Sequence, residues 1–380
     1  MKKYYLLAPG PTPIPPEVLQ ALSRPILHHR TPEFEALFAR VRAALAELCE
    51  TRSEVLVLAA SGTGAMEAAV VNLLSPGDEA IVVRCGKFGE RWAGICDAFG
   101  VTVRAVDAPY GESVPPERVA AALQAYPGAR ALFATQSETS TGVLEDIEGY
   151  AALTRRTDTL LVVDTVSSFG AVPCPMDAWG VDVVVTGSQK GLMCPPGLAF
   201  IALDDRAWRA AETARCPKFY WDLPAERKWQ AKRQAQYTPA VSLLMGLDAA
   251  LALMKAEGLP HVYRRHDRLA RAMRAGAEAL GLTLFARATP SPAVTAVVAP
   301  PGVDGEAVVR AYGEEHNITI AGGQGEMKGK IFRLAHLGYV GEYDVIVGLA
   351  ALERVLVRLG VPVDFGAGVA AAQKVFAKEA

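Results

Sequence analysis

The chain has 380 residues, of which 51% are hydrophobic and 21% charged, so it can bury a large core and should divide into roughly two domains. Its 39 basic and 41 acidic residues give a net charge of -2 without any dense basic run, so we expect no nucleic-acid partner. Prolines interrupt the N-terminal apolar patch and no later apolar run approaches membrane-spanning length, so we expect a cytoplasmic protein without membrane contact.

The first half of the chain alternates between short apolar runs and helical segments. A helix is predicted within residues 30–50, with Thr31 as its N-cap and Pro32 at the first helical position. Further strands are predicted at 54–60, 79–85, 101–107, 129–136, 159–166 and 181–188, and helices at 64–74, 88–100, 115–126 and 148–157. Because each crossover helix must bury its apolar stripe, this alternation predicts an α/β fold with a mostly parallel, doubly wound sheet.

The pattern changes at about residue 239, where long helical segments begin. The second half is predicted to contain helices at 240–258, 262–281, 305–316 and 343–360, and strands at 292–300 and 330–336. We therefore expect an N-terminal arm at 1–20, a large domain at 21–256 and a smaller C-terminal α+β domain at 257–380. Residues 366–380 are expected to form a loosely held tail.

The six cysteines are scattered, with no CxxC pair and no histidine at metal-binding spacing. We therefore expect buried, reduced thiols and neither a disulfide framework nor a metal site. Asn72 and Asn317 are the only asparagines, beside 25 prolines, a composition that leans toward a heat-adapted source and that a GC-rich genome would also favour.

Polar residues follow the predicted strands at the points where ligands bind in doubly wound sheets. Ser61, Gly62 and Thr63 lead directly into a helix. Free amides and hydroxyls there suit a phosphate, although an ordinary N-capping turn uses the same residue types. Asp164 ends an apolar strand, where a carboxylate needs a cation such as a protonated ring nitrogen unless it caps a turn.

Lys190 follows the next predicted strand, so its amine should reach the same crevice as the carboxylate of Asp164. A partly desolvated lysine has a lowered pKa and can condense with an aldehyde, whereas a lone lysine is usually a solvated surface charge. A phosphate cradle, a strand-end aspartate and a strand-end lysine, in that order, are what pyridoxal 5'-phosphate requires. The combination therefore predicts this cofactor.

The chain resembles the class V aminotransferases of pyridoxal-phosphate fold type I, in particular the alanine–glyoxylate and serine–glyoxylate (serine–pyruvate) branch. Seven segments in order carry the resemblance: LLAPGPTPIPPEVL, SGTGAMEAAVVNLLSPGD, SETSTGVL, VVDTVSSFGAVP, GSQKGLMCPPGLAF, YTPAVSLL and GGQGEMKGKIFRLAHLG. The resemblance implies transfer of an amino group from alanine or serine to a 2-oxo acid such as glyoxylate or pyruvate. It also implies ping-pong kinetics through a Lys190 aldimine, and a homodimer with shared active sites.

The resemblance also assigns individual residues. Lys190 matches the aldimine lysine that moves the substrate proton, and Asp164 matches the partner of the pyridinium nitrogen. Phe88 matches an aromatic residue that stacks on the pyridine ring of the cofactor. The alternative is that Phe88 only packs on the core side of its helix. The full set of implied cofactor contacts is Ser61, Gly62, Thr63, Phe88, Thr139, Asp164, Val166, Gln189, Lys190, Tyr237 and Thr238.

Some of these assignments leave a neighbouring residue open. Ser140 competes with Thr139 for the place near the ring hydroxyl. Thr238, with Tyr237 or Gln236, would reach the phosphate of the partner subunit, although the spacing of QYTPA departs from the mammalian pattern.

Two further residues are implied to meet the substrate. Arg333 matches the arginine that binds the substrate carboxylate, for which its planar fork is suited. Gly10 belongs to a loop that would line the substrate mouth.

Other functions stay open. Cysteine desulfuration would use a mobile cysteine and histidines at the positions of Phe88 and Gln189, and the nearby Cys194 is a lone thiol. Aminophosphonate or ureidoglycine aminotransferases would share the same residues. A subunit without catalysis, either a redox partner or a scaffold that keeps the fold, is the alternative from another class.

Overall fold

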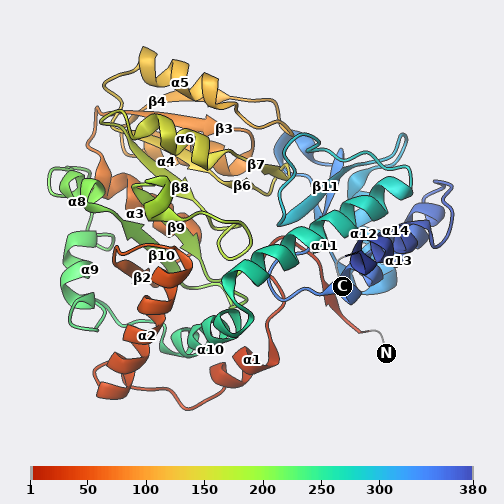
Figure 1. The fold of residues 1–380 in the computed structure, drawn as a ribbon, viewed down its shortest axis with the longest axis horizontal. Helices are drawn as coiled ribbons and strands as arrows, with labels where there is room; N and C mark the ends of the chain where they lie inside the picture. Colours follow the sequence, from red (N-terminus) through yellow and green to blue (C-terminus); the bar gives the residue numbers. More distant parts are fainter. Residues whose placement is uncertain (1–2, 379–380) are drawn as a thin grey trace.

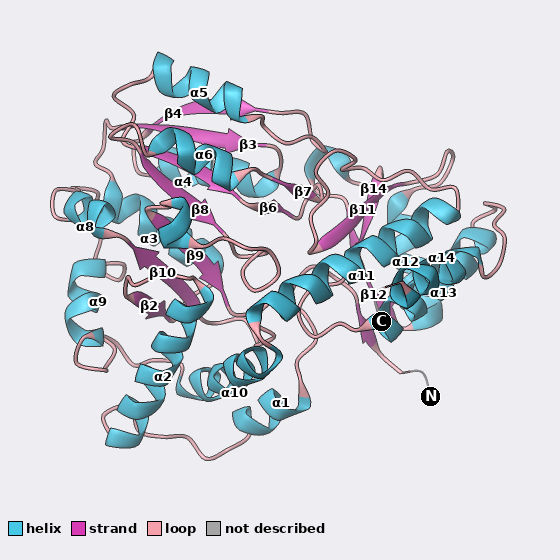
Figure 2. Ribbon diagram, viewed as in Figure 1, coloured by secondary structure: helices cyan, strands magenta, loops and turns pink. Residues whose placement is uncertain are grey.

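The main sheet has seven strands in the order β2-β10-β9-β8-β5-β3-β4 in the structure, a computed structural model that describes residues 3–378 (Figures 1 and 2). The strands in that order are Val55–Leu58, Ala199–Leu203, Val183–Gly187, Leu160–Asp164, Ala131–Thr135, Glu79–Arg84 and Thr102–Asp107. The pairs from β9 to β4 are parallel, whereas β10 runs antiparallel between β2 and β9. The predicted mostly parallel α/β sheet is confirmed.

Helices cover both faces of this sheet because its strand residues alternate between two cores. Ile81 and Val83 point into one core, and Ala80 and Val82 into the other. The first core is covered by α1 (Pro16–Leu22), α2 (Pro32–Leu48), α5 (Pro116–Ala125), α6 (Ile147–Thr154), α7 (Met176–Trp179) and α10 (Val241–Glu257). The second is covered by α3 (Gly62–Leu73), α4 (Lys87–Ala98), α8 (Asp205–Ala211) and α9 (Leu223–Gln230).

The predicted start of α2 is confirmed. Pro32 is its first residue, and the side chain of Thr31 accepts a hydrogen bond from the backbone N–H of Phe34 at 3.4 Å. The local sequence therefore determines where this helix begins.

A smaller sheet lies beside the main one, with the long helix α11 running between the two units (Figure 1). Its strands are β11 (Val294–Val298), β14 (Ile331–Ala335) and β13 (Ala321–Gly322), all antiparallel, and its helices are α11 (Leu259–Ala279), α12 (Gly305–His316), α13 (Glu342–Arg358) and α14 (Ala367–Ala377). The remaining short elements are β6 (Ser137–Glu138), β7 (Val143–Leu144) and η1 (Gly325–Met327). The chain passes from α10 to α11 at Gly258, and the domain division at residue 257 stays a prediction.

The N-terminal segment packs on the smaller unit. Strand β1 (Tyr5–Leu6) pairs in parallel with β12 (Ile318–Thr319), and Leu7 is buried in the core of that unit. Residues 9–12 are thereby held over the main sheet, where Thr12 N–H donates to the carbonyl of Gln189 at 3.1 Å. The segment predicted as an arm thus joins the two units.

The expectation of a loosely held C-terminal tail is wrong. Residues Ala367–Ala377 form helix α14, which packs on α11 and α13, with Ala372 fully buried and Phe376 only 5% exposed. Its buried residues recur at helical spacing, so one face of the helix is covered by its neighbours. Residues 379 and 380 of the predicted tail lie outside the described residues.

Two general properties bear on function. No helix within residues 3–378 combines the length and the apolar character needed to cross a membrane. All six cysteines are buried and unpaired with one another.

Candidate active site

The carboxyl ends of the adjacent parallel strands β8 and β9 bring Asp164 and Lys190 to one cavity of about 260 Å³. Nine of the residues predicted from the sequence line this cavity: Gly10, Ser61, Gly62, Thr63, Phe88, Asp164, Val166, Gln189 and Lys190. They come from five separate segments of the chain, and the fold brings these segments together around the cavity.

Asp164 is a buried carboxylate, only 3% exposed, that lines the cavity. One oxygen accepts from the N–H of Val166 at 2.7 Å, and the other accepts weakly from the hydroxyl of Thr135 at 3.4 Å. Burial raises the pKa of Asp164 to about 6. No ion pair to this carboxylate is recorded in the described part of the chain, so it can still accept from a protonated ring nitrogen.

Lys190 is 9% exposed, and its Nζ donates to the backbone carbonyl of Pro9. Burial lowers the pKa of Lys190 to about 8, while the charge of Asp164 opposes the shift and that of Arg333 adds to it. The amine is therefore partly neutral near pH 8, which is the nucleophilic form. Gly10 has a φ of +143° beside Nζ, and a Cβ at this position would overlap the amine, so glycine is required there.

The N-terminus of α3 offers neutral donors that fit a phosphate. Ser61 is the N-cap, and within residues 3–378 its hydroxyl makes no capping bond to the helix. Gln189 also lines this part of the cavity, and the Nε2 amide group of its side chain is a donor that could reach a phosphate. A Cβ at Gly62 would lie 2.6 Å from Cγ2 of Val166, so glycine keeps the helix start close to the cavity wall. These groups suit the predicted phosphate contact.

Phe88 and Val166 line the cavity and offer apolar faces to a flat ring. Phe88 lies in the first turn of α4, where its backbone N–H donates to Oε2 of Glu138 at 2.8 Å. Glu138 is fully buried and also accepts from the N–H of Gly89 at 3.1 Å, so a carboxylate fixes the start of this helix. Burial raises the pKa of Glu138.

Arg333 and Thr139 meet each other but are not among the residues that line the 260 Å³ cavity. Arg333 lies on β14, is 4% exposed, and donates from Nη1 to the carbonyl of Thr139 at 2.6 Å and from Nε to that of Gly322 at 2.9 Å. Burial lowers the pKa of Arg333 to about 10. The hydroxyl of Thr139 lies 3.5 Å from that of Ser167, which does line the cavity.

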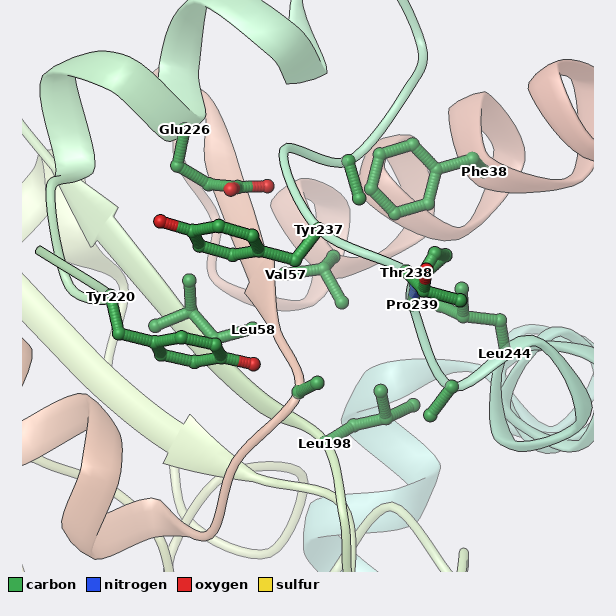
Figure 3. Close-up of a pocket in the computed structure, with 13 residues that line it drawn as sticks. Phe38, Val57, Leu58, Leu198, Tyr220, Glu226, Tyr237, Thr238, Pro239 and Leu244 are labelled. Atoms are coloured by element: carbon green, nitrogen blue, oxygen red, sulfur yellow. The ribbon is translucent and has the colours of Figure 1, made fainter. Parts of the chain in front are cut away.

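Tyr237 and Thr238 lie in a different cavity from Lys190 (Figure 3). The ring of Tyr237 stacks on that of Tyr220 with centroids 4.8 Å apart, and its hydroxyl donates to the carbonyl of Phe219 at 3.2 Å. Within one chain these residues do not join the other predicted contacts. Contact of these residues with the cofactor phosphate of a partner subunit remains a prediction.

The sequence reasoning missed several residues of the site. Arg91 lines the cavity together with Met66, Ser167 and Pro196, and the buried Glu138 holds the backbone of Phe88, another lining residue. A signal for Arg91 was present, because it follows Phe88 by one helical turn and so shares its face. The role of Glu138 depends on a contact between distant segments, which no local pattern reveals.

Comparison with known proteins identifies the family of the chain, although its relatives carry different names. The family model described as aminotransferase class-V matches residues 4–332. The chain is 47% identical to a Synechococcus protein named soluble hydrogenase, small subunit, over 98% of both chains. It is 40% identical to the L-aspartate–glyoxylate aminotransferase of Paracoccus denitrificans, over 97% of this chain and 95% of that one.

The crystal structure of pyridoxamine–pyruvate aminotransferase from Mesorhizobium loti matches with a TM-score of 0.95 and 30% identity. The match covers 100% of this chain and 98% of that chain. Enzymes of this family and fold depend in general on pyridoxal phosphate. The predicted fold type and enzyme class are thus confirmed, and the chain belongs to the class-V aminotransferase family.

Proposed function

We propose that the protein transfers the amino group of a small amino acid, alanine or serine, to a 2-oxo acid such as glyoxylate or pyruvate, with pyridoxal 5'-phosphate bound in the Lys190 cavity. The observation that carries this proposal is the buried amine of Lys190 facing the buried carboxylate of Asp164 across one cavity. Neither group has a protein ion-pair partner within residues 3–378, so both are available to a ligand. Burying two ionisable groups without ion-pair partners costs free energy of folding, and a ligand that binds to both groups offsets this cost.

The residues around the cavity divide the binding of the cofactor among them. Ser61 and the first amides of α3, with Gln189, hold the phosphate, and Phe88 and Val166 hold the faces of the ring. Asp164 accepts the hydrogen bond of the ring nitrogen and keeps that nitrogen protonated. When bound, the cofactor supplies an electron-withdrawing ring that stabilises a negative charge at the substrate α-carbon.

Lys190 carries out the proton transfer. Its pKa of about 8 lets the amine take a proton from the substrate α-carbon near neutral pH and then deliver it. The loop at Pro9 and Gly10 covers the amine and keeps bulk water from it. A base held in this position contributes about 10² to 10⁴ in rate.

Arg333 orients the substrate through its carboxylate. Its Nε and Nη1 atoms are fixed by backbone carbonyls, and no partner of Nη2 is recorded among the described residues. The guanidinium is therefore held rigidly with donor capacity left for a substrate. The acceptor proposed here is supported by the relatives, since the Paracoccus enzyme is named for glyoxylate and the Mesorhizobium enzyme for pyruvate.

A panel of donors and acceptors with the purified enzyme tests the proposed substrates. We expect alanine or serine with glyoxylate or pyruvate to give the highest kcat/KM, and parallel double-reciprocal plots when both substrates are varied. A preferred donor that lacks an α-carboxylate would contradict the role of Arg333.

The active site is proposed to be shared between two subunits, with Thr238 and Tyr237 reaching the phosphate of the partner. Their separation from the Lys190 cavity within one chain supports this arrangement. Mixing inactive Lys190→Ala with weakened Thr238→Val should restore activity in hybrid dimers, because one site then has both residues. If subunit exchange is verified and enzyme activity still does not recover, Thr238 lies outside the shared active site.

A subunit of a hydrogenase is a second candidate, because the Synechococcus relative carries that name. Burial raises the pKa of all six cysteine thiols, which disfavours the thiolates that bind metals. Residues 3–378 contain no group of three or more His, Cys, Asp or Glu side chains placed to hold a metal ion. Dye reduction by hydrogen with the purified chain would support this candidate, whereas a visible band that shifts with added amino acid and is absent in Lys190→Ala supports the aminotransferase.

Cysteine desulfuration has less support from the site. Cys194 is buried, its Sγ lies 3.8 Å from the carbonyl of Leu243, and burial raises its pKa to about 12. This thiol is therefore poorly suited to act as a mobile nucleophile. Formation of a persulfide on the protein after addition of cysteine would support desulfurase activity.

A further inference from the structure

Arg91 is held against the proposed cofactor site by two contacts. Its Nη1 donates to the hydroxyl of Thr63 at 3.0 Å, and its guanidinium carbon lies 4.8 Å from the centroid of the Phe88 ring. Arg91 lines the same cavity as Lys190, although the residue as a whole is exposed. A planar guanidinium is thus fixed between the start of α3 and the aromatic side chain of α4.

The charges around the cavity single out Arg91. Of the described residues that line the cavity, Lys190 and Arg91 carry the positive charges. The donors at the start of α3 are neutral hydroxyls and amides, with Gln189 beside them. A phosphate dianion in this cradle needs a full positive charge nearby, and Lys190 is committed to the aldehyde end of the cofactor.

The hydroxyl of Thr63 links Arg91 to the cradle. A threonine hydroxyl has one proton to donate and can accept two hydrogen bonds. Because this hydroxyl accepts from Arg91, its own proton is available for an acceptor in the cavity. Arg91 therefore orients Thr63 toward an anion and adds its charge to that of the hydrogen bond.

We propose that Arg91 is the cationic contact of the cofactor phosphate, acting directly and through the hydroxyl of Thr63. This inference rests on the proposed function, because it assumes that pyridoxal 5'-phosphate binds in the Lys190 cavity. It assigns a binding role to a residue that lies outside the phosphate loop.

The test compares pyridoxal 5'-phosphate with pyridoxal, which lacks the phosphate, in full-length protein carrying Lys190→Ala so that both bind without a covalent bond. Dissociation constants are measured by equilibrium dialysis and by absorbance titration. Adding Arg91→Met should raise the Kd of pyridoxal 5'-phosphate roughly 10- to 100-fold and change that of pyridoxal less than about threefold. The matched control is Arg104→Met, since Arg104 also stacks on a ring, that of Tyr126 at 4.7 Å, and should change neither constant.

Two other variants keep the proposal testable if Arg91→Met does not fold. Arg91→Lys retains the charge without the fork and should cause a smaller loss that is again specific to the phosphorylated ligand. Thr63→Val removes the linking hydroxyl and should weaken pyridoxal 5'-phosphate more than pyridoxal. Circular dichroism and the Tm verify that each variant is folded.

Three results would overturn the inference. Unchanged affinity for pyridoxal 5'-phosphate in Arg91→Met would show that Arg91 does not contact the phosphate. Equal losses for both ligands would reduce Arg91 to a support for Phe88. In Arg91→Met protein that keeps Lys190, a loss of kcat/KM confined to substrates with a second carboxylate, at unchanged cofactor affinity, would assign the guanidinium to the substrate. Failure of the proposed function is distinct, because the Lys190→Ala protein with Arg91 intact would then bind neither ligand.

Discussion

Two buried ionisable sites of this molecule differ in how many of their polar atoms are satisfied by the protein. At the carboxyl ends of the central strands β8 and β9, Lys190 and Asp164 line a cavity and have few protein partners. In the smaller unit, both ring nitrogens of His266 are bonded, Nδ1 to the carbonyl of Val262 at 2.8 Å and Nε2 to the N–H of Gly338 at 3.0 Å. Burial lowers the pKa of His266 to about 3.

The comparison shows that a shifted pKa does not by itself identify a functional residue. Burial causes the main pKa shift at both sites, but of the two only Lys190 and Asp164 combine it with a cavity and unused bonding capacity. Both ring nitrogens of His266 are satisfied by the protein, whereas Lys190 and Asp164 line a cavity and have no ion-pair partner among the described residues.

The largest effect is expected from Lys190→Ala. Removing the amine should lower kcat by about 10⁴-fold or more, because the same group anchors the cofactor aldehyde and moves the proton. The Tm should change little, since the lost group was buried without an ion-pair partner among the described residues. Steady-state kinetics and thermal unfolding provide the two readouts. A folded variant that keeps a tenth of the activity would place the base elsewhere.

Asp164→Asn should lower kcat by about 10² to 10³. The amide keeps the size of the side chain but cannot hold a proton on the ring nitrogen through a negative charge. We expect cofactor to remain bound, with a changed visible absorption spectrum. An unchanged rate with an altered spectrum would show that the charge of Asp164 has no part in the reaction.

His266→Gln should affect stability and leave kcat within about twofold of wild type. The folded pKa of about 3 lies below the unfolded value of 6.5, so between these values the unfolded chain binds more protons. Protonation of the unfolded chain therefore reduces the advantage of the wild type over the variant as pH falls below 6.5, by up to about 1.4 kcal/mol per pH unit.

Urea unfolding of both proteins between pH 7 and pH 5 measures this advantage. Taking the difference cancels the contribution of buried carboxylates such as Asp164, whose raised pKa acts in the opposite sense. A difference in unfolding free energy that does not vary with pH would show that His266 does not remain neutral in the fold.

A smaller effect is expected in the pH dependence of cofactor attachment. The rate at which cofactor-free protein reacts with pyridoxal 5'-phosphate should rise with pH and level off above about pH 8, where the amine of Lys190 is neutral. Stopped-flow absorbance measures this rate. A rise that continues to pH 10 would indicate a lysine with an ordinary pKa.

The parts of the site that follow from local sequence could be predicted. Asp164 and Lys190 were found because each follows an apolar strand, and the order of strands in a doubly wound sheet brings such ends together. Thr31 was found as an N-cap because the residues that cap a helix lie next to it.

The other features depend on contacts between distant segments. Glu138 reaches the start of α4 from another strand, and Arg333 spans the two units to reach Thr139. Strand β10 was missed because it enters the sheet antiparallel, without the crossover helix that marks the other strands. Helix α14 was missed because it is stabilised by packing on α11 and α13, contacts that no local pattern in residues 366–380 reveals.

The most direct test of the account is borohydride reduction of the enzyme loaded with pyridoxal 5'-phosphate, followed by proteolysis and mass mapping. The account predicts one phosphopyridoxyl group per chain, attached to Lys190 in the peptide that contains Gln189 and Gly191. Attachment to a different lysine, or no attachment in protein that absorbs like the loaded enzyme, would contradict it.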